Sequence, residues 1–180
     1  IDHYRSLTYP FNGELPVMIN PEFIYACAPR TTGDSPLWIS SPYLLGGGNG
    51  LNLVQDLVDA FSMVDGQDIN HSSTNYPYPD MDNNYLEIGG SNQAFSGYTL
   101  LAKTARMYDN REPRFYNAVS FHGSWQECAK RPYDFFYNGK DNIRTSSPHD
   151  APQNGYLVRK SLCMTDNKKT GVYLSLIHIS

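Results

Sequence analysis

Carboxylates, a serine and histidines that could support hydrolysis are present, but none stands in the spacing of a catalytic site. Glycoside hydrolysis needs two carboxylates about 5–9 Å apart, one of them with a raised pKa. The glutamates, none of which lies in a recognisable catalytic motif, are Glu14, Glu22, Glu87, Glu112 and Glu127. Ser124 follows Gly123 but lacks the second glycine of a nucleophile elbow. We therefore expect the protein not to be an enzyme, with a glycoside hydrolase fragment as the less favoured alternative.

Metal-ligating residue types are scattered in the same way, so we expect no metal and no cofactor. The histidines, which form no HExxH pair, include His3, His71, His122 and His149. The three cysteines, which form no CxxC pair, are Cys27, Cys128 and Cys163. Residues 80–84 have the alternating oxygen ligands of a calcium loop, but Tyr85 replaces its glycine and Ser91 its bidentate glutamate. A solvated acidic turn is the favoured interpretation.

Charge and glycine content exclude two further classes of site. The net charge is −4 and the basic residues form no long run, whereas nucleic-acid binding needs clustered cations that displace phosphate counterions. The glycine cluster of residues 46–50 lacks the Gly-Lys-Ser/Thr ending of a phosphate-binding loop. Neither a nucleic acid nor a nucleotide is an expected ligand.

The elements that must position any site are predicted to be short and joined by long loops. The chain has 14 Gly, 12 Pro and 14 Tyr in 180 residues, a composition that interrupts regular structure while its aromatic content still supports a folded core. Apolar spacing predicts helices over residues 51–62, capped by Asn49 or Asn52, and over Tyr98–Asp109. The predicted strands lie at residues 20–26, 115–121 and 156–162, with a hairpin turning at Asn138-Gly139. Long loops are predicted at 29–50 and 66–94, with a turn at Asp65-Gly66.

Three segments, in order, resemble elements of the RagB/SusD family. Residues 57–66, LVDAFSMVDG, resemble the family element ELVDAFPMADG. Residues 110–119, NREPRFYNAV, resemble NRDPRFYASI, and His122-Gly123-Ser124-Trp125 follows where NGSxW is usual. Residues 156–160, YLVRK, resemble the GYxxRKF strand, and Asn20-Pro21-Glu22 resembles a further element more weakly. Two residues differ from these family elements, because Ser62 replaces the usual proline and His122 the usual asparagine. The differences concern the subfamily and not the family.

This resemblance implies a mainly α-helical fold, SusD-like, with a tetratricopeptide-type helical scaffold in the parent protein. Residues 1–173 would form the middle-to-late, loop-rich part of that domain, with a few helices and short strands. The implied function is non-catalytic binding of oligosaccharide by a lipoprotein anchored in the outer leaflet of the outer membrane of a Bacteroidetes bacterium. The implied partner is a SusC-like TonB-dependent transporter, and the chain would contact the membrane only through a lipid anchor that it lacks. A peptide-binding relative of the same import system is the alternative.

Ligand contacts in such a protein are expected from aromatic residues on irregular loops, because a flat apolar face suits a sugar ring. The candidates, in the loop before the first predicted helix and in the tyrosine-proline segment, are Trp38, Tyr43, Tyr76 and Tyr78. Arg111 and Arg114 are instead expected to be structural, holding Glu112, Asp109 or backbone carbonyls, with Arg114 as a clamp.

The two ends of the chain are expected to be non-native boundaries. Ile1-Asp2-His3-Tyr4 begins without methionine, which indicates an internal fragment. Residues 174–180, LSLIHIS, match the translation of a sequencing-library transposase end, so they are predicted to be an adapter-derived tail and excluded from the fold.

Overall fold

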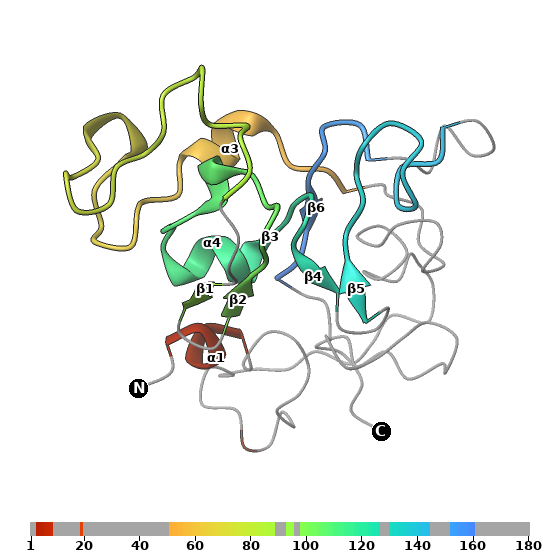
Figure 1. Ribbon diagram of the computed structural model, residues 1–180. Helices are drawn as coiled ribbons and strands as arrows, with labels where there is room; N and C mark the ends of the chain where they lie inside the picture. Colours follow the sequence, from red (N-terminus) through yellow and green to blue (C-terminus); the bar gives the residue numbers. More distant parts are fainter. Residues whose placement is uncertain are drawn as a thin grey trace.

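The structure is a computed structural model that describes residues 3–8, 19, 51–88, 93–95, 98–126, 130–144 and 152–160. Short elements are joined by long loops (Figure 1). The α-helices and 3-10 helices are α1 (His3–Thr8), α3 (Gln55–Asp59), η3 (Ile69–His71), η4 (Arg106–Tyr108) and α4 (Pro113–Ala118). The strands are β1 (Gln93–Phe95), β2 (Tyr98–Leu100), β3 (Val119–Ser120), β4 (Trp125–Gln126), β5 (Arg131–Pro132) and β6 (Leu157–Val158).

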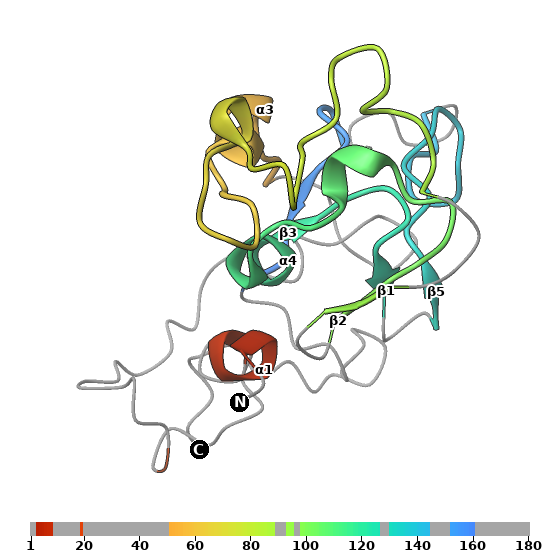
Figure 2. The same ribbon diagram turned by 60° about the vertical axis from the view of Figure 1, so that its left-hand side comes forward.

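Within these described ranges the strands form three antiparallel pairs, β1 with β2, β3 with β6 and β4 with β5. The β3–β6 pair joins distant parts of the chain, with Val119 opposite Val158. Helix α1 packs against α4, as Figure 2 shows from the side, and Asn117 Nδ2 donates to the Leu7 carbonyl at 3.1 Å. None of the helices in the described ranges is long and apolar enough to cross a membrane.

The predicted helix over residues 51–62 is only partly confirmed, because α3 covers only Gln55–Asp59. Its N-cap is Val54, without a side-chain cap, so the predicted asparagine cap is wrong. Asn52 instead forms an antiparallel bridge with Leu157 and accepts the Gln153 N–H at 3.0 Å. Pairing with the β6 segment takes these first residues out of the helix.

The predicted helix over Tyr98–Asp109 is wrong for most of its length. It begins as β2, in which Tyr98 and Leu100 are buried and Thr99 is exposed. Lys103 has φ 71°, outside the right-handed helical region, and only the single turn η4 is helical. The apolar residues reach the core first from a strand and then from a 3-10 turn. Together they have the same spacing in the sequence as the buried face of a helix.

The predicted strand over residues 115–121 is wrong up to Ala118, because α4 occupies that stretch. Pro113 begins the helix, where its fixed φ and missing N–H are favourable. Phe115, Tyr116 and Asn117 are all buried, so the alternation in the sequence does not correspond to two faces of a strand. Strand structure starts only at β3.

The predicted turns are confirmed. Gly66 has φ 84° and Asn138 has φ 59°, and the Gly139 N–H donates to the Phe136 carbonyl at 2.8 Å. The residues flanking Asn138-Gly139 do not pair as strands, so the hairpin itself is wrong. The 66–94 loop is irregular in its described residues apart from η3 and the start of β1. Of the predicted strand 156–162, residues 157–158 form β6; the predicted strand 20–26, the loop 29–50 and the tail 174–180 lie outside the described residues.

The core is built from stacked aromatic rings. Tyr98 stacks on Tyr116 with centroids 4.7 Å apart, and Tyr108 stacks on Phe121 at 4.3 Å. Phe115 lies edge-on to Tyr116. Each such pair adds about 0.5–1.5 kcal/mol beyond burial of apolar area. Aromatic packing thus stabilises a fold whose regular elements are too short to do so alone.

Arg111 connects α3 to this core from a fully buried position, with 0% of its surface exposed. Its Nη2 donates to the carbonyls of Val58 and Phe61, both at 2.7 Å, and its Nη1 to the Met107 carbonyl at 3.2 Å. Arg114 Nε pairs with Glu112 Oε2 at 2.5 Å, but 66% of its side chain is exposed. The prediction that these arginines hold Glu112 and backbone carbonyls is confirmed, and the buried clamp is Arg111 rather than Arg114.

Candidate functional site

Of the four predicted ligand residues, Tyr76 and Tyr78 lie in the described segment 51–88. Trp38 and Tyr43 lie outside the described residues and stay predictions. Tyr76 is 38% exposed. Tyr78 is half-buried, and its ring centroid is 5.6 Å from the Arg111 guanidinium carbon. The structure thus places one predicted tyrosine against the core and the other at the surface.

Hydrogen bonds from short polar side chains shape the tyrosine-proline segment. Ser72 Oγ accepts the Tyr78 N–H at 2.9 Å, and Ser73 Oγ accepts the Tyr76 N–H at 3.2 Å. Ser73 Oγ in turn donates to Asp65 Oδ2 at 2.5 Å, and this bond lowers the pKa of Asp65. Because these hydrogen bonds already hold the backbone of the segment, it loses little conformational entropy when a ligand binds to its side chains.

Tyr78 lines a cavity of about 600 Å³, here called the Tyr78 cavity. Polar side chains dominate its remaining wall, and Ile88 adds an apolar surface. The polar residues that line it are Asp80, Asn83, Arg106, Asp109 and Asn110. One aromatic ring together with carboxylate, amide and guanidinium groups suits a ligand with hydroxyl groups and an apolar ring face. Tyr76 does not line this cavity.

Asp80, one of the two acidic residues at the Tyr78 cavity, begins a turn. Asp80 Oδ1 accepts from Asn83 Nδ2 at 2.6 Å, and the Asp80 carbonyl accepts the N–H groups of Asn83 and Asn84 at 3.0 and 2.9 Å. Asp80 and Met81 are exposed, as the interpretation of a solvated turn requires. In the part of the chain that the structure describes, no three His, Cys, Asp or Glu side chains are grouped to hold a metal ion.

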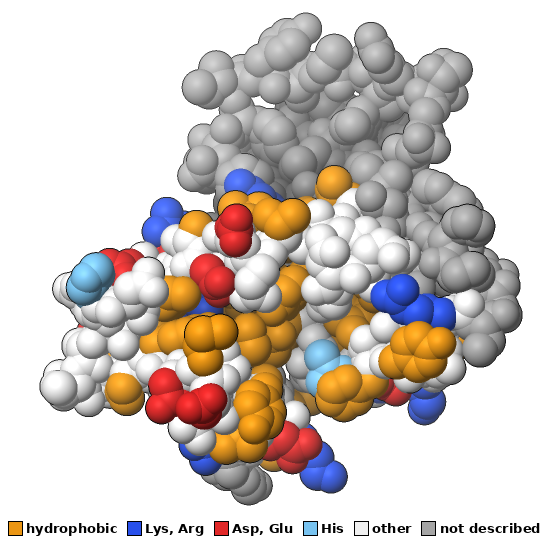
Figure 3. All heavy atoms as spheres, turned by 90° about the horizontal axis from the view of Figure 1, so that it is seen from above, with side chains coloured by type: hydrophobic (Ala, Val, Ile, Leu, Met, Phe, Trp, Pro, Cys, Tyr) orange, Lys and Arg blue, Asp and Glu red, His pale blue; other side chains and the backbone are white. Residues whose placement is uncertain are grey.

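A second cavity, of about 400 Å³, lies beside His122 and is here called the His122 cavity. Charged groups of both signs and one exposed aromatic ring line it, including Glu87, Lys103, Asp134, Phe136 and Lys140. In the space-filling view of Figure 3, hydrophobic side chains form patches on the surface among acidic and basic ones. Sequence analysis did not predict this cavity. The available signal was the aromatic pair Phe136-Tyr137 directly before an Asn-Gly turn.

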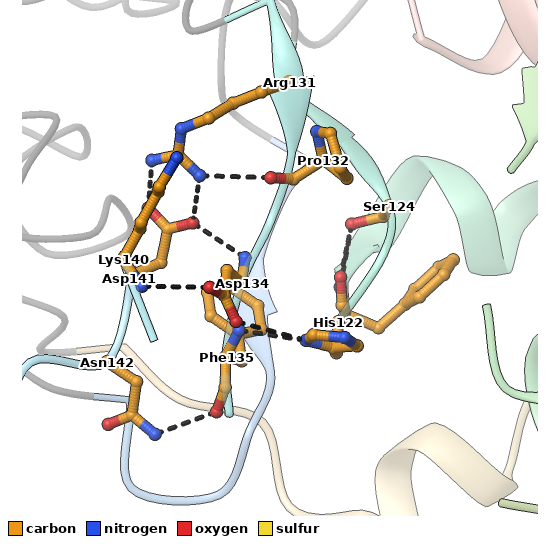
Figure 4. Close-up of polar contacts among 10 residues, drawn as sticks. His122, Ser124, Arg131, Pro132, Asp134, Phe135, Lys140, Asp141 and Asn142 are labelled. Atoms are coloured by element: carbon orange, nitrogen blue, oxygen red, sulfur yellow. Dashed lines mark hydrogen bonds and ion pairs between the residues drawn. The ribbon is translucent and has the colours of Figure 1, made fainter. Parts of the chain in front are cut away.

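His122 organises one wall of this cavity (Figure 4). The Phe135 N–H donates to His122 Nδ1 at 3.1 Å, and the His122 ring lies 3.8 Å from that of Phe136, centroid to centroid. Because Nδ1 accepts this bond, the neutral ring carries its proton on Nε2. Burial lowers the pKa of His122, while Asp134, 4.0 Å away, acts in the opposite direction.

An ion pair fixes the loop that carries Phe136. Asp141 is fully buried and accepts from both terminal nitrogens of Arg131, at 2.5 and 2.7 Å. Its Oδ2 also accepts the Asp134 N–H at 2.8 Å, and Asn142 Nδ2 donates to the Phe135 carbonyl at 2.8 Å. The bond to Asp141 raises the pKa of Arg131. The ion pair and these hydrogen bonds therefore hold the loop residues next to Phe136.

Comparison with known proteins gives a family match. A model of the SusD family matches residues 22–179, which contain all three resembling segments and both cavities. No curated protein and no solved structure matches the chain.

Proposed function

Because the chain belongs to the SusD family, we propose that it binds an oligosaccharide in the Tyr78 cavity and releases it chemically unchanged. Proteins of this family are outer-membrane lipoproteins that bind nutrients in glycan uptake, and they are generally not catalytic. The observation that carries the proposal is the composition of the Tyr78 cavity, whose lining residues combine one tyrosine with carboxylate, amide and guanidinium side chains.

Each kind of group has a separate part in this proposal. The Tyr78 ring covers the apolar face of one sugar. Carboxylate oxygens of Asp80 and Asp109 accept hydrogen bonds from hydroxyl groups, and Arg106 donates to ring or hydroxyl oxygens. Trp38 and Tyr43 remain proposed contacts at the same ligand.

Capture would precede import through a TonB-dependent transporter of the SusC type in the outer membrane, with the protein held at the outer leaflet by a lipid anchor. Binding of the oligosaccharide shifts the complex of this protein and its transporter toward a closed state that contains the ligand. No covalent chemistry is involved. We likewise propose that the parent protein has a mainly α-helical scaffold of the SusD type.

The first experiment measures binding of a panel of neutral oligosaccharides together with the release of reducing sugar, on the wild-type chain. The variants are Tyr78→Ala and Arg106→Gln, and the matched control is Tyr85→Ala, whose tyrosine is 66% exposed and lines neither cavity. Binding without sugar release, weakened about tenfold by each cavity variant and unchanged in the control, is the expected result.

Other outcomes would contradict the proposal. Because Tyr78 also contacts Arg111, circular dichroism checks that Tyr78→Ala is folded, and Arg106→Gln tests the cavity from an exposed position. Sugar release would indicate a hydrolase, for which the pairs of carboxylates lining each cavity would be the starting point. Binding of peptides in place of every glycan would assign the chain to the peptide-binding alternative.

A further inference from the structure

The Tyr78 and His122 cavities lie on opposite faces of one short antiparallel ladder. The Ile88 N–H donates to the Thr104 carbonyl, and the Arg106 N–H to the Leu86 carbonyl, both at 2.8 Å, with Glu87 paired opposite Ala105. Successive side chains of a strand point to opposite faces. Accordingly Ile88 lines the Tyr78 cavity and the adjacent Glu87 lines the His122 cavity, with Arg106 also at the first cavity and Lys103 at the second.

The His122 cavity has the chemistry that a sugar ring requires. Phe136 is 68% exposed at its wall and offers a flat apolar face. Glu87 and Asp134 supply hydrogen-bond acceptors, and the ammonium groups of Lys103 and Lys140 supply donors. Because carboxylates and ammonium groups are balanced, the cavity suits a neutral ligand with many hydroxyl groups better than an ion of either sign.

Contacts within the chain hold the wall of the cavity. The Phe136 ring lies against His122, and His122 is held by the Phe135 N–H. Asp141 accepts hydrogen bonds from both Arg131 and the Asp134 backbone (Figure 4). Arg131 is neutralised in this way, so it does not attract an anionic ligand into the cavity. A preformed wall reduces the entropy lost on binding.

The geometry points to a second saccharide-binding site in the His122 cavity, with Phe136 as the stacking surface and Glu87, Lys103, Asp134 and Lys140 as its hydrogen-bonding groups. This inference rests on the proposed function, because it takes the ligand of the Tyr78 cavity to be a saccharide. The two sites, separated by the ladder of residues 86–88 and 104–106, hold one polysaccharide at two points. Binding at the second point becomes intramolecular, which raises the apparent affinity for a long chain far above that for a short one.

The test is isothermal titration of the wild-type chain and three variants with neutral trisaccharides (malto-, cello-, manno- and xylotriose) and with the matching polysaccharides. Phe136→Ala removes the stacking surface, and Lys140→Gln replaces the charged ammonium donor with a shorter, neutral amide at an exposed position. Tyr137→Ala is the matched control, because Tyr137 is the adjacent aromatic residue, is 75% exposed and does not line the cavity. A fourth variant, Tyr78→Ala, reports on the other site.

Wild type is expected to bind about two equivalents of one trisaccharide, and Phe136→Ala about one, with the remaining site unchanged. Lys140→Gln weakens the second site about tenfold, and Phe136→Ala weakens polysaccharide binding about a hundredfold. Tyr137→Ala behaves as wild type.

Two results would overturn the second site and leave the first intact. One is wild-type stoichiometry and affinity in Phe136→Ala while Tyr78→Ala loses binding. The other is binding of short and long glycans by wild type with equal affinity at a single site. Loss of every equivalent in Phe136→Ala would show that the cavities are not separate sites. Absence of glycan binding in wild type would overturn the proposed function itself, and the inference with it.

Discussion

Two arginines of one motif have different roles at the scale of the residue. Arg111 is fully buried and its guanidinium reaches three backbone carbonyls, those of Val58, Phe61 and Met107. Burial lowers its pKa, and the carbonyl partners together with the ring of Phe115, 4.8 Å from the guanidinium carbon, offset the loss of water. Arg114 pairs with Glu112 at the surface, where an ion pair contributes little.

Arg111→Lys is therefore expected to lower the free energy of unfolding by about 2–4 kcal/mol, because the single nitrogen of a shorter ammonium side chain cannot replace both Nη2, which bonds Val58 and Phe61, and Nη1, which bonds Met107. Arg114→Lys, the matched control, should change it by less than about 0.5 kcal/mol. Urea unfolding followed by tryptophan fluorescence measures both. Equal effects would show that the carbonyl contacts of Arg111 do not stabilise the fold.

His122 predicts how stability depends on pH. Burial lowers its pKa from the ordinary value of 6.5, against the opposing charges of Asp134, Glu87 and Asp141. The folded chain thus binds its proton less readily than the unfolded chain does. This contribution to stability is fully present above pH 6.5 and is lost as the pH falls through the lowered pKa of the folded state.

The measurement is the urea midpoint at about pH 7.5 and about pH 5.5, in wild type and in His122→Asn. The asparagine oxygen can accept the Phe135 N–H and does not titrate, so the variant should lose less stability than wild type between the two pH values. An identical pH dependence in both proteins would exclude His122 as its source.

At the scale of the element, turns replace long helices and strands as the features that set the chain path. Gly123 has φ 85°, and a Cβ built there would lie 3.0 Å from Thr104 Oγ1. The Gly123 N–H also donates to the Tyr133 carbonyl at 2.9 Å, which fixes the crossing between β3 and β4 beside the His122 cavity. Gly66 has almost the same φ, 84°, but a Cβ there would contact nothing within 4 Å.

Gly123→Ala should therefore destabilise the fold by about 2–3 kcal/mol, and Gly66→Ala by only about 1 kcal/mol, since both incur backbone strain and only the first also meets Thr104. Thermal and urea unfolding of the two variants separate the destabilisation caused by the Thr104 contact from that caused by the positive φ. A cost at Gly66 as large as that at Gly123 would mean that the positive φ alone decides the loss.

At the scale of the whole molecule, the described residues form a large aromatic core and a smaller buried cluster of Tyr133, Phe135 and Leu157. The core cluster joins α1, β2, η4, α4 and β3 through residues such as Tyr4, Tyr98 and Phe121. The 72–84 segment is instead held mainly by bonds within itself. Local opening therefore requires far less free energy in that segment than in the core.

Hydrogen exchange should reflect this division. Amides of residues 115–121 are expected to exchange more slowly than those of residues 73–82, and added glycan should slow exchange in the second group because the ligand binds only the closed segment. Mass spectrometry of peptides covering both stretches makes the measurement. Similar protection of the two stretches in the free chain would contradict a higher stability of the large aromatic core than of the 72–84 segment.

Local chemistry determined what the sequence alone could predict. Gly66 and Asn138 tolerate positive φ wherever they stand, so both turns followed from residue type. The family followed from contiguous motifs that a family model also matches. The acidic turn at Asp80 and the hydrogen-bonding role of the arginines followed from the same kind of local reasoning.

Contacts between residues distant in the sequence determined the features that the sequence did not predict correctly. Asn52 pairs with Leu157 and shortens α3, and Lys103 takes a positive φ that divides the helix predicted over Tyr98–Asp109. The buried face of α4 is shared by consecutive residues, so apolar alternation misrepresented it as a strand. His122 and Phe136 meet across two loops that are joined by the Phe135–His122 and Gly123–Tyr133 hydrogen bonds. Residue type sets which backbone conformations a position can adopt, but which groups meet across the core depends on packing between distant segments, and only the tertiary structure determines that packing.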